Sequence, residues 1–445
     1  MHLVVELIQY LMVLLIGVYS FYSFSVVRFR NKRMQDKSYR KLSASIYLLH
    51  FIGYFTLYFQ TMNDKLLFLY AGEVLLIILV NTFYQTFYPK RSKLLVSNML
   101  MLLTIGFIIL ARLSYDKAVK QVLIVAVSFL VCLIVPVTIK RITFLKRFGW
   151  IYGILGIAIL FVVLFAGTTN YGATNWLTIG GFSFQPSEIV KLIFVFSIAA
   201  MLQERINLKK ICIVTVIAGV HVLILVIQKD LGGALIFFVT FVFMLYTATS
   251  RPLYLFSGLA GGSVAAFIAY KLFYHVRVRV MAWQNPMRYI EKEGYQISQS
   301  LFAIGTGGWF GMGLNRGLPT SIPVVESDFV FSAIAEEFGA LFALCMILIY
   351  INCFIMLINI ALTMEDAFYR LISLGFSVMF GFQVILSIGG VIKFIPSTGV
   401  TLPFISSGGS SVFATIVMFM ILQGIYLKVK SDKEEPIEEG VQKDQ

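Results

Sequence analysis

The residues best suited to chemistry lie in a long polar stretch between two apolar stretches. This polar stretch runs over residues 271–328 and ends at Asp328, directly before an apolar helix that carries Glu336 and Glu337. Carboxylates at or just inside the end of a membrane-spanning helix are costly unless they face a cavity or a partner, which favours a functional role. We therefore expect acid-centred chemistry at a membrane surface, with Asp328 as the best single candidate.

Two further polar segments could contribute to such a site. In one, a proline suited to the first turn of a helix is followed by a serine, a glutamate and, one turn later, a lysine. A helix cap with an ion pair between residues i and i+3 is the simpler explanation of that segment taken alone. The other, at Asp230, is a polar break between two apolar spans, where a bare turn is the usual explanation. The candidates in the first segment are Trp176, Gln185, Ser187, Glu188 and Lys191.

The long polar stretch and the last loop supply the remaining candidates. The last loop ends in two glycines and two serines at the start of the final helix. Amides and hydroxyls at a helix N-terminus suit a phosphate group, although the same residues can simply cap the helix. The long stretch contains Arg279, Gln296 and Gln299, and the last loop contains Lys393, Gly408, Gly409, Ser410 and Ser411.

The composition predicts a polytopic membrane protein. Of the 445 residues, 59% are hydrophobic and 13% are charged, and the mean hydropathy is +0.87, which excludes a soluble domain. Apolar stretches of about 17 to 25 residues predict roughly thirteen membrane-spanning helices. The first stretch lacks a charged leader and a cleavage site, so we expect it to remain as a helix.

Basic loops predict how these helices are oriented. Lysines and arginines gather in residues 28–41, 90–93, 140–147 and 205–210, which alternate onto one side of the predicted helices. By the positive-inside rule that side is cytoplasmic, so the N-terminus and the polar segments described above lie outside. The net charge of +14 needs no nucleic acid, because the basic residues are spread over short loops.

The glycines of residues 305–313 do not form a nucleotide-binding loop. They lack the lysine and the strand that a phosphate-binding loop needs, and no Gly-x-x-x-x-Gly-Lys-Ser/Thr sequence occurs elsewhere. We predict a flexible or closely packed turn there, which argues against an ATP-driven pump.

Taken together, the polar segments resemble the SEDS (shape, elongation, division and sporulation) family, the group that contains FtsW, RodA and SpoVE. The sequences QPSE, DLGGAL, GYQISQSLFAIGTGG, SDFVFSAIAEEFG and TGVTLPFIS followed by GGSS occur in the family's order and spacing between Lys93 and Lys428. The resemblance implies an all-α polytopic membrane protein, with a ten-helix bundle and a long extracellular loop before the helix near residue 345.

The chain adds about three transmembrane helices ahead of that bundle. We predict an N-terminal membrane extension over residues 1–88, the SEDS membrane domain over 89–430 and a disordered cytoplasmic tail over 431–445. Glu73 is the one ionisable residue that we place deep in the spans of the extension. Three roles stay open for this part of the chain: docking of a partner, regulation, and a purely structural role.

The resemblance implies a peptidoglycan glycosyltransferase that polymerises lipid II on the outer face of the bacterial cytoplasmic membrane. A sugar hydroxyl must attack an anomeric carbon, and this step needs a base. Asp328 matches the family's catalytic aspartate, and Glu336 and Glu337 match its acidic pair. A carboxylate close to Glu326 and Glu336 could have its pKa raised towards a useful value.

Lipid II, the undecaprenyl-pyrophosphate-linked disaccharide pentapeptide, would lose its pyrophosphate in that reaction. Cations must stabilise the leaving group, and Arg279, Lys191 or Lys393 could do so together with the amides near Gly408. A divalent cation, Mg²⁺ or Mn²⁺, could share this task, although no ligand cluster with metal spacing is visible in the sequence.

The resemblance also implies partners. Family members pair with a class B penicillin-binding protein, a transpeptidase, so we expect such a partner and other division or elongation machinery. Whether the chain serves elongation, division or sporulation is left open.

The chain departs from the family pattern at three positions. It has Glu326 in place of a histidine, Lys229 in place of a proline and Ser407 in place of a tyrosine. The alternatives are a flippase for the lipid-linked precursor and a non-catalytic division scaffold.

Overall fold

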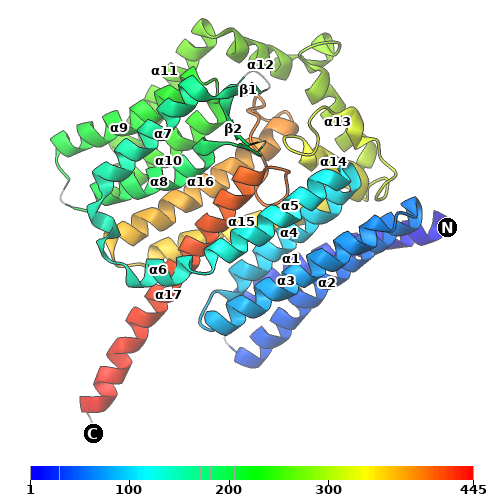
Figure 1. The fold of residues 1–445 in the computed structure, drawn as a ribbon, viewed down its shortest axis with the longest axis horizontal. Helices are drawn as coiled ribbons and strands as arrows, with labels where there is room; N and C mark the ends of the chain where they lie inside the picture. The colour runs from blue at the N-terminus through cyan, green and yellow to red at the C-terminus, as the bar shows by residue number, and fades with distance from the viewer. Residues whose placement is uncertain (1, 30, 171–172, 181, 205, 444–445) are drawn as a thin grey trace.

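The fold is an almost entirely helical bundle (Figure 1). The computed structural model describes residues 2–29, 31–170, 173–180, 182–204 and 206–443. Its long helices are α1 (His2–Arg28), α2 (Lys32–Thr61), α3 (Lys65–Phe87), α4 (Lys93–Leu113), α5 (Tyr115–Cys132) with α6 (Val135–Arg141), α7 (Gly149–Ala166), α8 (Pro186–Leu202), α9 (Leu208–Ile227), α10 (Leu231–Thr249), α11 (Pro252–Leu272), α15 (Ala340–Thr363), α16 (Ala367–Val391) and α17 (Gly409–Lys443).

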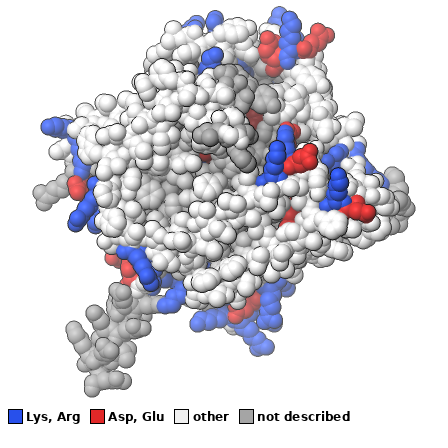
Figure 2. All heavy atoms as spheres, in the orientation of Figure 1, with Lys and Arg blue, Asp and Glu red and all other residues white. Residues whose placement is uncertain are grey.

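These helices confirm the predicted polytopic membrane protein. Within the described residues, 12 segments have the length and hydropathy of membrane spans, with α5 and α6 counted as one segment that breaks before Pro136. The helix α8 has 17 residues, which is the lower limit for a span. With α8 included, the structure contains a helix for each of the thirteen spans that we predict. Figure 2 shows charged side chains mainly towards the ends of the bundle, with a broad uncharged surface between them.

The shorter elements lie in the connections that we predict to be outside the membrane. Figure 1 shows α12, α13 and α14 at one end of the bundle, opposite α6 and the C-terminal end of α17. They are α12 (Tyr274–Gln284), α13 (Tyr295–Gly307) and α14 (Val330–Phe338), with the 3₁₀ turns η2 (Pro286–Tyr289) and η3 (Pro319–Ser321); a further turn, η1 (Phe144–Arg147), follows α6.

A small antiparallel sheet, absent from the sequence-based predictions, occupies the connection between α7 and α8. Its strands are β1 (Thr168–Asn170), β2 (Ala173–Ile179) and β3 (Phe182–Phe184), paired in the order β1-β2-β3. The backbone N–H of Thr174 donates to the carbonyl of Gln228, 3.0 Å away, which ties the sheet to the end of α9. The sheet therefore holds its residues next to the start of α10.

The predicted close turn of glycines fastens the polar stretch to the start of α15. The amide of Met312 donates to the carbonyl of Glu336 at 2.8 Å, and the amide of Ala340 donates to the carbonyl of Gly308 at 2.9 Å. A Cβ atom on Gly339, where φ is +88°, would lie 2.3 Å from the backbone nitrogen of Gly311. Only glycine allows this approach, so the turn is closely packed.

The N-terminal helices dock on the rest of the bundle through α1 and α2. The helix α1 packs against α2 and α15, and α2 packs against α4. A buried chain of hydrogen bonds joins them: the Tyr19 hydroxyl donates to the Asn98 side chain (2.9 Å), whose amide donates to the Asn352 side chain (2.8 Å). Interhelical polar contacts of this kind stabilise helix packing within membranes.

One prediction for the extension is wrong. Glu73 is not the only ionisable residue deep in its spans, because His50 on α2 lies opposite it, with 2.7 Å between Nε2 and Oε2, and both side chains are fully buried. The pairing offsets much of the cost of burying either group alone.

The helix α17 extends into the segment that we predict to be a disordered tail. The side chains after residue 432, and residues 444–445 as a whole, lie outside the described part of the chain. Disorder in the tail therefore stays a prediction.

Candidate active site

Asp328 lies between η3 and α14 and points towards the segment that precedes α17. A Cβ atom on Gly399 would lie 3.4 Å from Asp328 Oδ2 and 4.0 Å from Arg279 Nη2, so the three residues meet. Gly399 has a φ of +72°, which disfavours any residue with a side chain. Because Gly399 has no side chain, the place beside the carboxylate that a Cβ atom would take is left free.

The electrostatic surroundings of Asp328 suit a general base. Burial raises the pKa of the Asp328 carboxyl, whereas the Ser327 hydroxyl and the Arg279 guanidinium oppose this shift, and Glu326 adds to it. Glu326 is in turn paired with Lys117 on α5. The predicted effect of Glu326 on this pKa thus has the expected direction, but burial is the main cause and Glu336 is not among the causes.

Arg279 is fixed by the same segment. Its Nη1 donates to the carbonyl of Ser397 at 3.2 Å, and on the same helix Trp283 Nε1 donates to the carbonyl of Lys393 at 3.1 Å. Burial lowers the pKa of Arg279, and the charges of Asp328 and Asp230 oppose that effect. Arg279 is thus a partly buried cation that faces two carboxylates.

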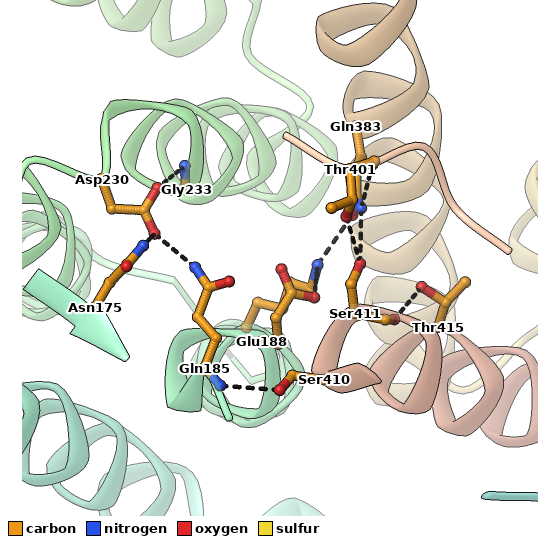
Figure 3. A network of polar contacts seen from close by, with 11 residues as sticks. Asn175, Gln185, Glu188, Asp230, Gly233, Gln383, Thr401, Ser410, Ser411 and Thr415 are labelled. Atoms are coloured by element: carbon orange, nitrogen blue, oxygen red, sulfur yellow. Dashed lines mark hydrogen bonds and ion pairs between the residues drawn. The ribbon is translucent and has the colours of Figure 1, made fainter. Parts of the chain in front are cut away.

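Asp230 is the centre of a second group of polar residues, which we call the Asp230 network (Figure 3). One of its oxygens caps α10 by accepting from the Gly233 amide at 2.8 Å. The other accepts from the side chains of Asn175 at 3.1 Å and Gln185 at 3.2 Å, which both point to it in Figure 3. These hydrogen bonds tie Asp230 to α10, to the small sheet and to the residue that precedes α8.

Lys191 forms a third group, the Lys191 network. Its ammonium lies 2.6 Å from Glu188 Oε2 and donates to the Gln383 side chain at 2.9 Å. The amide of Gln383 donates to the carbonyl of Thr401 at 3.1 Å, and the Thr401 hydroxyl donates to Ser411 at 2.8 Å. These contacts join α8, α16 and α17.

The segment 397–401 connects the three groups. Gly399 adjoins Asp328 and Arg279, while a Cβ atom on Gly232 at the start of α10 would lie 2.4 Å from Val400. A small cavity of ≈ 40 Å³ lies between α8, α10 and this segment, and its lining residues include Gln185, Ser187, Glu188, Lys191, Asp230 and Gly399. The structure therefore brings most of the predicted residues of three distant segments together.

The glycines and serines at the start of α17 are engaged by the protein itself. The Ser410 hydroxyl accepts from the backbone amide of Gln185 at 2.9 Å, and Ser411 receives the bond from Thr401. A Cβ atom on Gly409 would lie 2.8 Å from Ile124, so this position is glycine for close packing. Gly408 precedes the helix and is half-buried. This geometry favours the capping interpretation over a phosphate cradle.

Glu336 and Glu337 hold the polar stretch in place. Glu336 accepts from the backbone amide of Leu318 at 2.9 Å, and Glu337 accepts from Arg112 Nε on α4 at 2.9 Å. Burial raises the pKa of Glu337 to about 7, against the opposing charge of Arg112. Both acids lie on α14, which Gly339 separates from the span α15. Their contacts indicate positioning, and direct contact with a substrate stays a prediction.

The remaining predicted residues lie at the edge of this region. Trp176 is half-buried on β2, and its neighbour Asn175 is the residue that enters the Asp230 network. Gln296 and Gln299 are half-buried on α13, whose buried Ser300 donates to the carbonyl of Val391 at 2.9 Å. For Lys393, the structure records the backbone contact with Trp283.

Sequence reasoning did not select several residues of the site. They are Asn175, Gln383, Thr401, Gly399 and Arg112. A glutamine within an otherwise apolar span was the signal for Gln383, because a polar side chain there needs a partner. Gly399 carried no signal of its own, since its role depends on two segments that are far away in the sequence.

The described residues do not build a complete metal site. Among them, no group of three or more His, Cys, Asp or Glu side chains is arranged to hold an ion. The oxygens of Asp230 already accept hydrogen bonds, and Glu326 is paired with Lys117. A magnesium or manganese ion at Asp328 would have to take its other ligands from phosphate oxygens and water. The cation stays a prediction.

The fold and the site define a polytopic membrane protein with an acid-centred polar site at one end of its helices. A family model described as a cell cycle protein of the FtsW, RodA and SpoVE group matches residues 92–431, beginning at the start of α4. The chain belongs to this family.

Individual relatives agree with this assignment. The peptidoglycan glycosyltransferase RodA of Mycobacterium tuberculosis is 30% identical over 376 residues, which cover 77% of this chain and 79% of that protein. A probable peptidoglycan glycosyltransferase FtsW of Shewanella sediminis is 34% identical over 284 residues, covering 60% and 68%. A chain of a solved peptidoglycan synthase complex is 26% identical, with a TM-score of 0.64 over 77% of this chain and 98% of that chain.

Proposed function

We propose that this chain is a peptidoglycan glycosyltransferase that polymerises lipid II at the outer face of the bacterial cytoplasmic membrane, with Asp328 as its general base. The names of the RodA and FtsW relatives support the activity. The observation that carries the assignment of the base is the position of Asp328 beside Arg279 and under Gly399, with a pKa raised by burial.

The reaction assigns a task to each of these two side chains. Asp328 takes the proton from the 4-hydroxyl of one sugar as its oxygen forms a bond to the anomeric carbon of another. The bond from that carbon to the pyrophosphate oxygen breaks, and the lipid pyrophosphate leaves with the electron pair. Arg279 is the cation next to Asp328, and it stabilises the negative charge that develops on the leaving group.

The membrane orientation supports an outward-facing site. The basic loops that mark the cytoplasmic side lie at the helix ends opposite to the connections that hold Asp328, Asp230 and Gly399. The lipid pyrophosphate would then lie at the membrane surface beside Arg279. A magnesium or manganese ion could accompany the pyrophosphate, but no step described above depends on it.

A class B penicillin-binding protein is the partner that we propose. The similar solved chain belongs to a peptidoglycan synthase complex that coordinates polymerisation and crosslinking, which supports a transpeptidase partner. The helix α11 contains no buried residue, so much of its surface is available for contact with lipid or a partner helix. We expect low activity without the partner and higher activity with it.

The flippase alternative has less support. It would use Lys191, Glu336 and Glu337 to pass a charged headgroup through the bundle, but these side chains are held by ion pairs or hydrogen bonds inside the protein. A scaffold without catalysis would tolerate loss of the Asp328 charge as long as the helices still pack.

The test is a polymerisation assay on the chain purified with its penicillin-binding protein. Labelled lipid II and divalent cations are supplied, and glycan products of the native protein are compared with those of Asp328→Asn. Glu293→Gln, an exposed change in the same polar stretch, is the matched control. We expect polymer from the native protein and the control and none from Asp328→Asn, with partner binding intact in all three. Undiminished polymer from Asp328→Asn would refute this base.

A further inference from the structure

A second pocket lies at the opposite end of the molecule, where the extension meets the family domain. It has a volume of ≈ 580 Å³ and is lined by α1, α2, α15, α17 and the loop before α4. Four basic side chains and one acidic side chain line it, which gives a net charge of +3. These are Lys32, Arg91, Lys93 and Lys430, with Asp36.

Arg91 is a buried cation in this pocket with an unused donor. Its side chain belongs to a residue that is 7% exposed, and Nη2 donates to Asn81 at 3.3 Å. Its Nε is buried and has no hydrogen-bond partner among the described residues. A buried N–H without a partner is costly, and more so when it carries charge. An anion in the pocket would remove that cost.

The structure holds these cations in place before any ligand arrives. Gln423 on α17 makes two hydrogen bonds with the backbone of Ser92, at 3.0 and 3.1 Å, which fix the loop that carries Arg91 and Lys93. The ammonium of Lys93 lies 5.4 Å from the centre of the Tyr39 ring and 3.7 Å from Asp36. The loop that carries Arg91 and Lys93 is therefore preorganised beside the pocket.

The rest of the lining indicates an amphipathic ligand. Val26 on α1, Leu94 on α4, and Met356 and Ile360 on α15 form apolar walls next to the basic groups. The pocket adjoins the basic loops that mark the cytoplasmic side, where anionic lipids and basic pockets between helices attract one another. A guanidinium suits a phosphate group because it offers several donors in one plane.

We propose that this pocket binds the phosphate group of an anionic phospholipid from the cytoplasmic leaflet, with its acyl chains against the apolar walls. The bound lipid contacts α2 of the extension and α4 and α17 of the family domain at once, and so strengthens their association. A soluble phosphate ion would make the same contacts with the basic side chains, but the apolar walls favour the lipid.

The test is native mass spectrometry of the full-length chain in detergent, titrated with phosphatidylglycerol or with phosphatidylcholine. Arg91→Gln/Lys430→Gln removes two pocket charges, and Lys37→Gln/Arg40→Gln removes two exposed charges on α2 outside the pocket. We expect the first phosphatidylglycerol to bind the native chain and the control equally, and the pocket variant at least about tenfold more weakly, a difference of about 1.4 kcal/mol.

A second variant guards against misfolding at the buried Arg91. Lys93→Gln/Lys430→Gln changes only less buried positions, and we expect it to lose affinity several-fold while retaining the native melting temperature. Equal binding by the pocket variants and the control would overturn the proposal, as would equal binding of the two lipids. Stabilisation of the native chain by inorganic phosphate as large as that by phosphatidylglycerol would overturn the lipid assignment.

Discussion

Asp230 and Asp328 lie at the same end of the molecule and both face Arg279, but their surroundings differ. Asp230 accepts hydrogen bonds from Gly233, Asn175 and Gln185. Among the described residues, the neighbours that favour the charged form of Asp328 are the Ser327 hydroxyl and the Arg279 guanidinium, and burial outweighs them and raises its pKa. An acid that accepts hydrogen bonds from several elements holds those elements together, whereas an acid whose burial outweighs its polar neighbours is better suited to accept a proton.

Apart from the loss of Asp328 itself, the largest effect that sharpens this comparison concerns the cation between the two acids. We expect Arg279→Gln to lower the polymerisation rate roughly 10²-fold, as is typical for the loss of one charge-stabilising donor. Arg279 lowers the pKa of Asp328, so its removal raises that pKa further, and the rate should then need a higher pH to reach its plateau. A pH–rate profile measures both effects.

The control for this prediction is Arg277→Gln, on the same helix, where the side chain is exposed. It should leave the rate and the profile unchanged. An Arg279→Gln profile shifted to lower pH would contradict the electrostatic account of Asp328.

A smaller effect is expected from closing the space over Asp328. Gly399→Ala places a methyl carbon 3.4 Å from Oδ2 and adds backbone strain of about 1–2 kcal/mol at a φ of +72°. Gly180→Ala has similar strain, with a φ of +59°, but its Cβ would lie in open space in the small sheet. The rate should fall about tenfold for Gly399→Ala only. Equal rates for the two variants would show that the space over the carboxylate is not used.

Asp230→Asn should affect stability more than chemistry. One oxygen becomes an amide that cannot accept, so a donor among Gly233, Asn175 and Gln185 loses its partner. We expect the variant to be less stable by about 1 kcal/mol. Thermal unfolding in detergent measures the loss, and Asp230→Ala should lose more. A variant as stable as the native protein would show that the network does not hold α10.

The smallest effect concerns the pH dependence of Glu337. Because burial raises the pKa of Glu337 to about 7, the folded state keeps this proton at a pH where the unfolded chain releases it. The folded protein should therefore lose stability as the pH rises from the usual glutamate range to about 7. Melting temperatures from pH 4.5 to 8 should show this slope in the native protein and a smaller slope in Glu337→Gln. Identical slopes would contradict the shift.

The sequence was sufficient to predict the spans and the general location of the site. Length and hydropathy depend only on local composition, so the helices were predictable, α8 with its 17 residues included. Asp328 stands out in the sequence because an acid at the edge of a span is costly unless it has a task, and its role as the base stays a prediction. Contacts between distant segments cannot be predicted from local composition. For that reason the sequence does not reveal His50 as the partner of Glu73.

The contacts of three predicted site residues have a common physical cause. Glu336 and Glu337 were interpreted as acids inside a span, but Gly339 ends α14 and lets the two acids turn towards Arg112 and the Leu318 amide. Ser410 was interpreted as a possible phosphate ligand, but it accepts from the Gln185 backbone. In each case a distant segment supplies the partner, and sequence spacing does not reveal it.

The most direct test of the account compares Asp328→Asn and Asp230→Asn in one experiment. Both variants are purified with the penicillin-binding protein, and initial rates of lipid II polymerisation are measured at equal amounts of complex. We predict a loss of roughly 10²- to 10⁴-fold for Asp328→Asn, the usual contribution of a general base, and less than about tenfold for Asp230→Asn. Equal losses, or a larger loss for Asp230→Asn, would contradict the assignment of Asp328 as the base.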